Sequence, residues 1–309
     1  MTQLRSTSAF EPWRIAEAFW EPQVLVDSAW HRHAPFAFWL VGALRPRRFV
    51  ELGTHNGFSF FTVCEALQRF EVPDASATAV DTWLGDDQAG YYGPEVHRSV
   101  EAIARERYPG IARLERSTFD EAAVGVPAGS IDLLHIDGRH GYDDVAHDFE
   151  TWSPKLTERA VVVFHDTSER TEGFGVWRFW AEVAERHPSF AFVHGHGLGV
   201  LAVGDDVPSE VLEFIDVARA EPDAVEAWFA ERGEAVARAH AAAAARAAED
   251  ARRAAEIAAL TAENATLRAR LDAAAEERRH ILASTSWRIT APARAAGALA
   301  RRLRRPGVG

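Results

Sequence analysis

A glycine-containing turn between an apolar strand and an amphipathic helix is the feature that most constrains this chain. Residues 50–59 run Val-Glu-Leu-Gly-Thr-His-Asn-Gly-Phe-Ser, and a helical pattern continues to residue 69. Gly53 and Gly57 permit positive φ and let a ligand approach the backbone, while Glu51 can accept hydrogen bonds from a cationic amino group. The segment predicts a ligand-binding turn that includes Glu51, Gly53, Thr54 and Gly57.

Short apolar runs alternate with amphipathic stretches after Pro46, which is typical of βαβ units around a parallel sheet. The expected strands are residues 48–52, 77–80, 112–115, 131–136 and 160–164. Two more apolar runs, 190–193 and 199–203, flank a Gly-rich connection and predict an antiparallel hairpin at the sheet edge. The predicted fold is α/β and Rossmann-like, with a mostly parallel doubly wound sheet, an antiparallel edge hairpin and a long helical tail.

Composition divides the chain into four predicted segments. They are an aromatic-rich helical segment (1–45), the α/β domain (46–208), an Ala-rich helix (209–283) and a basic tail (284–309).

One seam of the Ala-rich helix alternates spacings of three and four residues, which is the pattern of a short coiled coil. Its members are Ile257, Leu260, Asn264, Leu267 and Leu271. We expect a homo-oligomer through this tail, and a single solvated Ala-rich helix is the alternative.

Charge and composition exclude several classes of function. The formal net charge of -12 disfavours nucleic-acid binding, which depends on cations that neutralise phosphates. The only lysine is Lys155, and no G-x-x-x-x-G-K-[ST] loop is present, which excludes P-loop chemistry. The single cysteine, Cys64, falls among apolar residues and is expected to be buried. Since the sequence has neither a signal peptide nor an apolar run of membrane-spanning length, we expect a cytoplasmic protein.

Asp81 ends the next expected strand, where an acid in a doubly wound sheet can bind the ribose hydroxyls of a nucleoside. NAD would require a G-x-G-x-x-G turn for its pyrophosphate, but Gly53, His55 and Phe58 stand at those positions. A cofactor without phosphate that carries an ammonium and a sulfonium fits this turn better.

Four segments together resemble class I S-adenosylmethionine-dependent methyltransferases, namely residues 50–59, 81–93, 131–142 and 164–167. The resemblance extends to metal-dependent sugar O-methyltransferases and to cephalosporin-hydroxylase-like proteins. It implies that Glu51, Gly53 and Gly57 bind the methionine end of S-adenosylmethionine and that Asp81 binds its ribose. Ser117 falls where the adenine pocket would be, although it suits a helix N-cap equally well.

Polar residues follow two neighbouring strands of the predicted sheet, at the edge where ligands bind. They are Asp137, His140, His165 and Asp166. Because a sugar hydroxyl is a weak nucleophile, its methylation needs a base, for which His140 is suited, and preferably a cation. The resemblance implies the same roles for an Asp-x-x-His segment and an acidic pair at the next strand end. Here His165 replaces the first acid of that pair, so Asp137, His165 and Asp166 are expected to bind Mg²⁺ or Mn²⁺.

A polar and aromatic loop follows Asp81 and is expected to bind the acceptor through Trp83, Asp86, Tyr91 and Tyr92. An ordered surface loop packed by its own aromatics is the alternative.

Residues 285–309 contain six arginines and no acid, which favours contact with an anionic membrane surface at the inner face of the cell membrane. Residues 284–292 also resemble a segment of bacterial glycosyltransferases that build surface polysaccharides, which implies a glycosyltransferase partner.

The expected function is S-adenosylmethionine-dependent O-methylation of a sugar or glycan hydroxyl in polysaccharide or glycoconjugate biosynthesis. One alternative is a non-haem iron oxygenase that uses His135, Asp137 and His165. The other is a non-catalytic coiled-coil protein that assembles glycosyltransferases.

Overall fold

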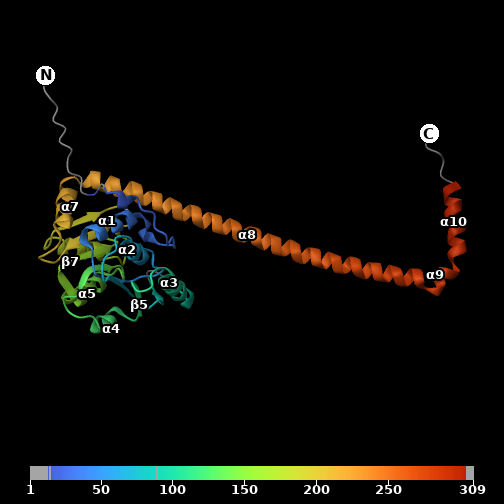
Figure 1. Ribbon diagram of the computed structural model, residues 1–309, viewed down its shortest axis with the longest axis horizontal. Helices are drawn as coiled ribbons and strands as arrows, with labels where there is room; N and C mark the ends of the chain where they lie inside the picture. Colours follow the sequence, from blue (N-terminus) through green and yellow to red (C-terminus); the bar gives the residue numbers. More distant parts are fainter. Residues whose placement is uncertain (1–12, 14, 88–89, 304–309) are drawn as a thin grey trace, which may run out of the picture. The chain divides into compact units, whose positions relative to one another are not determined.

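A seven-stranded sheet forms the centre of the computed structural model, which describes residues 13, 15–87 and 90–303 (Figure 1). The strand order is β5-β2-β1-β6-β7-β9-β8. The strand β9 runs opposite to the other six, which all point the same way. The bounds are β1 (Arg48–Leu52), β2 (Ser76–Asp81), β5 (Ala112–Arg116), β6 (Ile131–Ile136), β7 (Leu156–His165), β8 (Ser189–Phe192) and β9 (Leu198–Ala202). The predicted α/β fold with an antiparallel edge hairpin is confirmed.

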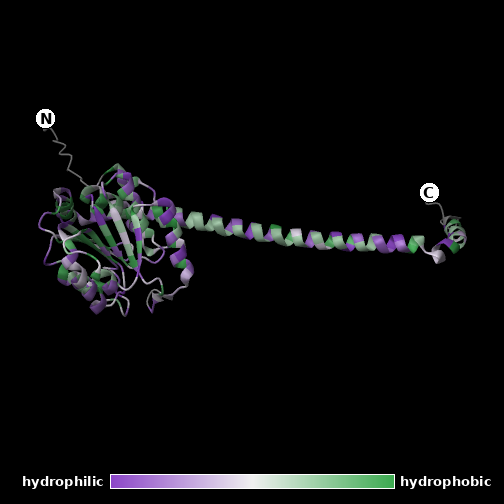
Figure 2. Ribbon diagram, turned by 60° about the horizontal axis from the view of Figure 1, so that its bottom comes forward, coloured by the Kyte–Doolittle hydropathy of each residue, from purple (hydrophilic) through white to green (hydrophobic). Residues whose placement is uncertain are grey.

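Helices cover both faces of this sheet, so the side chains of each strand alternate between two apolar clusters. Phe49 of β1 packs with α1 (Ala34–Leu44), α2 (Phe58–Arg69), α3 (Pro94–Arg107) and α7 (Ser209–Ala220). Val50 and Leu52 pack with α4 (Phe119–Val124), α5 (Tyr142–Trp152) and α6 (Val176–Val183). Double coverage explains why the inner strands are continuous apolar runs, which Figure 2 shows as green ribbons.

The N-terminal segment packs into the same core as the sheet. The 3₁₀ helices η1 (Ala16–Phe19) and η2 (Ala29–His33) lead into α1, whose first turn contains Pro35. Trp13, Trp30 and Phe36 are almost fully buried there. The expected short helices are present, although residues 1–12 and 14 of the expected segment 1–45 lie outside the described residues.

The chain divides into two compact units, and the first, which contains the sheet, ends at Ala243. The expected α/β domain ends earlier, at residue 208. Phe214 and Ile215 of α7 and Val225 and Phe229 of α8 (Pro222–Ala283) are fully buried in the first apolar cluster. The composition changes after Pro208, but these apolar side chains still recur at helical spacing and cover the sheet, which is why the domain continues.

A second unit begins at Ala244 and consists of the rest of α8, α9 (Thr285–Ile289) and α10 (Ala291–Leu303). The predicted long helix is confirmed, and the last six residues of the expected basic tail, 304–309, lie outside the described residues. None of the helices in the described part of the chain is both long enough and apolar enough to cross a membrane.

Candidate active site

A cavity of about 730 Å³ opens at the carboxyl ends of β1, β2, β6 and β7, where a doubly wound sheet binds its ligands. Its volume lies within the range of small-molecule sites. Lining residues come from the ends of these four strands and the loops that follow them, from the turn between β5 and α4, and from the N-terminal segment. They include Ser28, Trp30, Gly53, Thr54, Asp81, Thr118, Phe119, Asp137, His140, His165 and Asp166.

Asp81 organises the turn that follows β1. Its Oδ2 accepts hydrogen bonds from the backbone amides of Thr54 (2.8 Å) and His55 (2.9 Å), and its Oδ1 accepts one from the amide of Trp83 (2.7 Å). Gly53 has φ of 86°, and a Cβ there would overlap the carbonyl oxygen of Asp137. The turn and the loop after β6 therefore touch at a position that only glycine can occupy.

Glu51 lies behind the cavity and not on its wall. Its carboxylate is fully buried, and Oε2 pairs with Nδ1 of His135 at 2.9 Å. Burial raises the pKa of Glu51, and His135 and Ser59 partly oppose the rise. Gly57 is also absent from the lining and instead caps α2 with φ of 85°. Glu51 and Gly57 therefore do not line the cavity, because one is paired with His135 in the interior and the other begins α2, and their contacts with a ligand stay a prediction.

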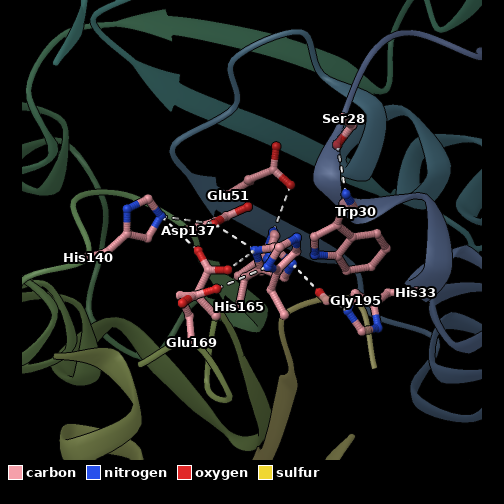
Figure 3. Close-up of polar contacts among 12 residues, drawn as sticks. Ser28, Trp30, His33, Glu51, Asp137, His140, His165, Glu169 and Gly195 are labelled. Carbon is pink, nitrogen blue, oxygen red and sulfur yellow. Dashed lines mark hydrogen bonds and ion pairs between the residues drawn. The ribbon is translucent and has the colours of Figure 1, made fainter. Parts of the chain in front are cut away.

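Two histidines and two aspartates meet in the cavity lining, and Figure 3 shows His140, His165 and Asp137 of this group. His140 Nε2 lies 2.9 Å from Asp166 Oδ2 and 3.9 Å from Asp137 Oδ1. His165 Nδ1 lies 3.2 Å from Asp137 Oδ1 and 3.4 Å from Asp166 Oδ1. The four residues that the sequence placed at strand ends therefore form one cluster.

The two carboxylates control the protonation of both rings. Burial lowers the pKa of His140, but hydrogen bonds and charge from Asp137 and Asp166 outweigh it and raise that pKa to about 9. Burial also opposes protonation of His165, yet the same carboxylates raise its pKa to about 10. Burial works against ionisation of Asp166, but both histidines lower its pKa to about 2. Without a bound cation, the cluster at neutral pH contains two imidazolium groups between two carboxylates.

A shared backbone contact fixes the orientation of the His165 and His33 rings. His165 Nε2 donates to the carbonyl of Gly195 at 3.2 Å, and His33 Nε2 donates to the same carbonyl at 2.9 Å (Figure 3). Since a carbonyl only accepts, Nε2 of His165 carries a hydrogen and Nδ1 is the atom that faces the carboxylates. Asp166 itself has φ of 60°, a left-handed conformation that is uncommon outside glycine and concentrates at functional sites.

The acceptor loop is only partly as expected. Asp86 and Tyr92 line the cavity, and the Tyr92 ring packs on that of His55 at a centroid distance of 4.9 Å. Trp83 is fully buried and donates from Nε1 to the His55 carbonyl, so it supports the turn and does not face a ligand. Tyr91 is 80% exposed and lies outside the lining. Neither Trp83 nor Tyr91 lines the cavity, because one ring packs inward and the other is exposed to solvent, so their acceptor contacts stay a prediction.

Ser117, the residue expected at the adenine pocket, is not part of the cavity lining, and the two residues after it are. Ser117 donates to the Thr118 carbonyl and does not line the cavity, whereas Thr118 and Phe119 do. Thr118 caps α4 in a capping box with Glu121, so the alternative N-cap role belongs to Thr118 and not to Ser117.

The N-terminal segment and the loop before α6 also contribute to the cavity region, which the sequence does not indicate. The Phe174 ring stacks on His140 at 4.6 Å with an interplanar angle of 10°, and the adjacent Gly175 amide donates to the His140 carbonyl. Trp30 and Ser28 line the cavity from the N-terminal segment. No local pattern marks them, because tertiary packing alone brings them to the site.

Metal-binding geometry does not favour the iron oxygenase alternative. In the described chain, the carboxylates and imidazoles close enough to share an ion are Asp137, His140 and Asp166, with ligand atoms within 4.8 Å of one another. His135 pairs with Glu51 instead, so the expected set with His135 does not assemble.

A family profile described as a methyltransferase domain matches residues 50–167. This segment is similar to methyltransferase domains. The match, together with the sheet described above, agrees with the expected resemblance to class I S-adenosylmethionine-dependent methyltransferases and with the expectation of an enzyme.

Part of the chain is similar to a curated protein of Sinorhizobium fredii, uncharacterized protein y4gI. The two are 53% identical over 180 residues, which make up 58% of this chain and 20% of that protein. The chain therefore spans about a fifth of the length of this curated relative.

Solved methyltransferases are also similar to the chain. The O-methyltransferase TomG from Streptomyces achromogenes, in complex with S-adenosylmethionine, is 17% identical with a TM-score of 0.44, and the alignment covers 59% of this chain and 83% of TomG. A putative caffeoyl-CoA O-methyltransferase from Staphylococcus aureus is 14% identical with a TM-score of 0.45, over 59% and 86% of the two chains.

Proposed function

We propose that this protein transfers a methyl group from S-adenosylmethionine to a hydroxyl oxygen of a sugar or glycan, with His140 as the general base. The observation that supports it best is the position of His140, which shares one cavity with Gly53 and Asp81 and is held between Asp166 and Phe174. A base and a nucleoside-binding acid in one cavity are what a methyl transfer to oxygen requires.

The cofactor half of the cavity suits a nucleoside with an amino-acid side arm. Gly53 and Thr54 leave the backbone open to the methionine end, and Asp81 stands at the end of β2 for the ribose. Thr118 and Phe119 offer a hydroxyl and an aromatic ring for adenine. When bound, S-adenosylmethionine supplies an electrophilic methyl group on a sulfonium.

The donor set of the cluster fits a divalent cation. Asp137 and Asp166, two members of the group close enough to share an ion, would contribute carboxylate oxygens. Nδ1 of His165, 3.2 Å from Asp137 and 3.4 Å from Asp166, would contribute a nitrogen in place of the third member, His140, which is kept as the base. An imidazole in this set favours Mn²⁺ over Mg²⁺, since nitrogen donors suit the softer ion. A cation there would stabilise negative charge on the acceptor oxygen.

The residues of the chain would handle the proton. Neutral His140 accepts the proton of the acceptor hydroxyl at Nε2, and Asp166 then accepts a hydrogen bond from the imidazolium. Phe174 keeps the ring in place by stacking, and the Gly175 amide fixes the backbone of His140. The acceptor oxygen, freed of its proton, would take the methyl group that bound S-adenosylmethionine would supply.

Polar side chains in the cavity lining favour a polyhydroxylated ligand. Asp27, Ser28, Asn56, Asp86 and Arg139 are among the lining residues and offer donors as well as acceptors. The basic tail supports a site of action at an anionic membrane surface, in polysaccharide or glycoconjugate assembly.

Isothermal titration with S-adenosylhomocysteine tests the cofactor, and transfer of a labelled methyl group to a panel of sugar acceptors tests the reaction. We expect Asp81→Ala to weaken binding markedly, and His140→Ala to retain binding while turnover falls by two to four powers of ten, about the usual contribution of a general base. His187→Ala, a histidine outside the cavity lining, is the matched control. Binding of NAD without binding of S-adenosylhomocysteine would refute the proposal. A native chain that binds neither would favour the assembly-protein alternative.

A further inference from the structure

The second unit carries an exposed apolar stripe along α8. Ile257, Leu260, Leu267 and Leu271 are each at least half exposed, between 52% and 71%. Their spacing places them on one side of the helix, and Asn264 completes the stripe between Leu260 and Leu267. We call these five residues the α8 seam. A seam of alternating threes and fours is the pattern that a helix buries against another helix.

The charged residues beside the α8 seam have no partner within their own helix. Ion pairs that stabilise α8 lie before the seam, between Glu249 and Arg253, and after it, between Glu276 and Arg279. In the described part of the chain, Glu263 and Arg268 flank the seam and make no ion pair. With Asn264 at position a of the heptad, Glu263 occupies g and Arg268 the following e.

We infer that a second copy of this chain covers the α8 seam in a parallel, in-register, two-stranded coiled coil. In that arrangement a g residue faces the e residue five positions later on the other helix, so each Glu263 meets the Arg268 of the second copy. An antiparallel pair would instead layer a positions against d positions, so that Asn264 would face Leu260 or Leu267 of the second copy and lose a polar partner.

Asn264 supports the same register and the same number of strands. Its Nδ2 donates to the Leu260 carbonyl in the single helix, at 3.1 Å. An asparagine at a is best satisfied by the asparagine of a parallel partner in register, and it favours two strands over three at some loss of stability. The dimer goes beyond the methyl transfer proposed above and does not depend on it.

Cysteine cross-linking of the full-length chain tests the register. We expect Ile257→Cys and Asn264→Cys to form covalent dimers on mild oxidation, because each a residue faces its own copy in a parallel pair. Ala262→Cys, at the outward f position of the same helix, is the matched control and should stay monomeric on a denaturing gel. The native Cys64 is fully buried and does not compete. Equal cross-linking at 262 and 264, or none at 264, would overturn the parallel register.

Charge reversal of the full-length chain tests the pairing. Glu263→Arg and Arg268→Glu should each raise the dimer dissociation constant about tenfold in sedimentation equilibrium, because each creates two like-charge contacts. An equimolar mixture of the two variants should dimerise at least as well as the native chain, since one helix then has two positive flanks and the other two negative ones. A native chain that stays monomeric at about 100 μM, or that forms a trimer, contradicts the inference. Unchanged binding of S-adenosylhomocysteine by these variants keeps this outcome separate from that of the proposed function.

Discussion

The raised pKa of His140 gives the proposed methyl transfer a steep dependence on pH. With a pKa of about 9, the ring is protonated over most of the neutral range, and only about 1% of it is free to accept a proton at pH 7. In the presence of a chelator we therefore expect the rate to rise about tenfold per pH unit above pH 7 and to level off near pH 9. The sign follows from the role, because a general base works only when it is deprotonated.

Two changes should move the midpoint of this profile downward. Asp166→Asn removes one of the two carboxylates that raise the pKa of His140, so this pKa should fall. Added Mn²⁺ would place positive charge beside Asp137 and Asp166 and should lower the same pKa. Initial rates of labelled methyl transfer, measured between pH 6 and pH 10, would show either shift of the midpoint. The assay must resolve rates that differ by about two orders of magnitude. A profile that is flat over this range, or that is identical in Asp166→Asn, would refute the assignment of His140 as a base held by these carboxylates.

Three further predictions concern stability and surface binding. Gly53→Ala should cost about 3 kcal/mol or more in urea denaturation, since its Cβ would overlap Asp137 in a positive-φ turn, whereas Gly110→Ala, with φ of 88° and open space around it, should cost about 1 kcal/mol. Burial raises the pKa of Asp148 to about 7, so native stability should fall as pH rises from 4 towards 7, and Asp148→Asn should be more stable than the native chain by about 1–4 kcal/mol at pH 8 but not at pH 4. The full-length chain should sediment with vesicles that contain phosphatidylserine and not with neutral ones, and Leu299→Glu, on exposed α10, should weaken this binding.

The sequence predicts the sheet well where burial is complete. The bounds of β1 and β6 are as expected, because each is a short, mostly apolar run between turn residues. The strand β7 begins four residues before the expected start, since polar residues such as Glu158 pair by backbone and carry no hydrophobic signal. The coiled coil stays a prediction, because the exposure of its seam shows only that a partner is needed.

The sequence predicts the active-site cluster from topology, since Asp137, His140 and Asp166 all follow the ends of parallel strands. The orientation of loop aromatics is not encoded locally. Trp83 and Tyr92 belong to the same polar loop, yet one ring is buried and the other lines the cavity. Phe174 reaches His140 only because α5 and α6 pack together, which no single segment reveals.

The shared carbonyl of Gly195 has a consequence for the order of assembly. It lies between β8 and β9 and is 162 residues along the chain from its partner His33. Contacts between such distant residues require large loops to close and form late in folding. On the ribosome, the cofactor turn and both aspartates emerge before the hairpin that orients His165. A nascent chain that stops short of this hairpin would contain a cofactor-binding half without a completed catalytic half, so the enzyme becomes active only when its last two strands have joined the sheet.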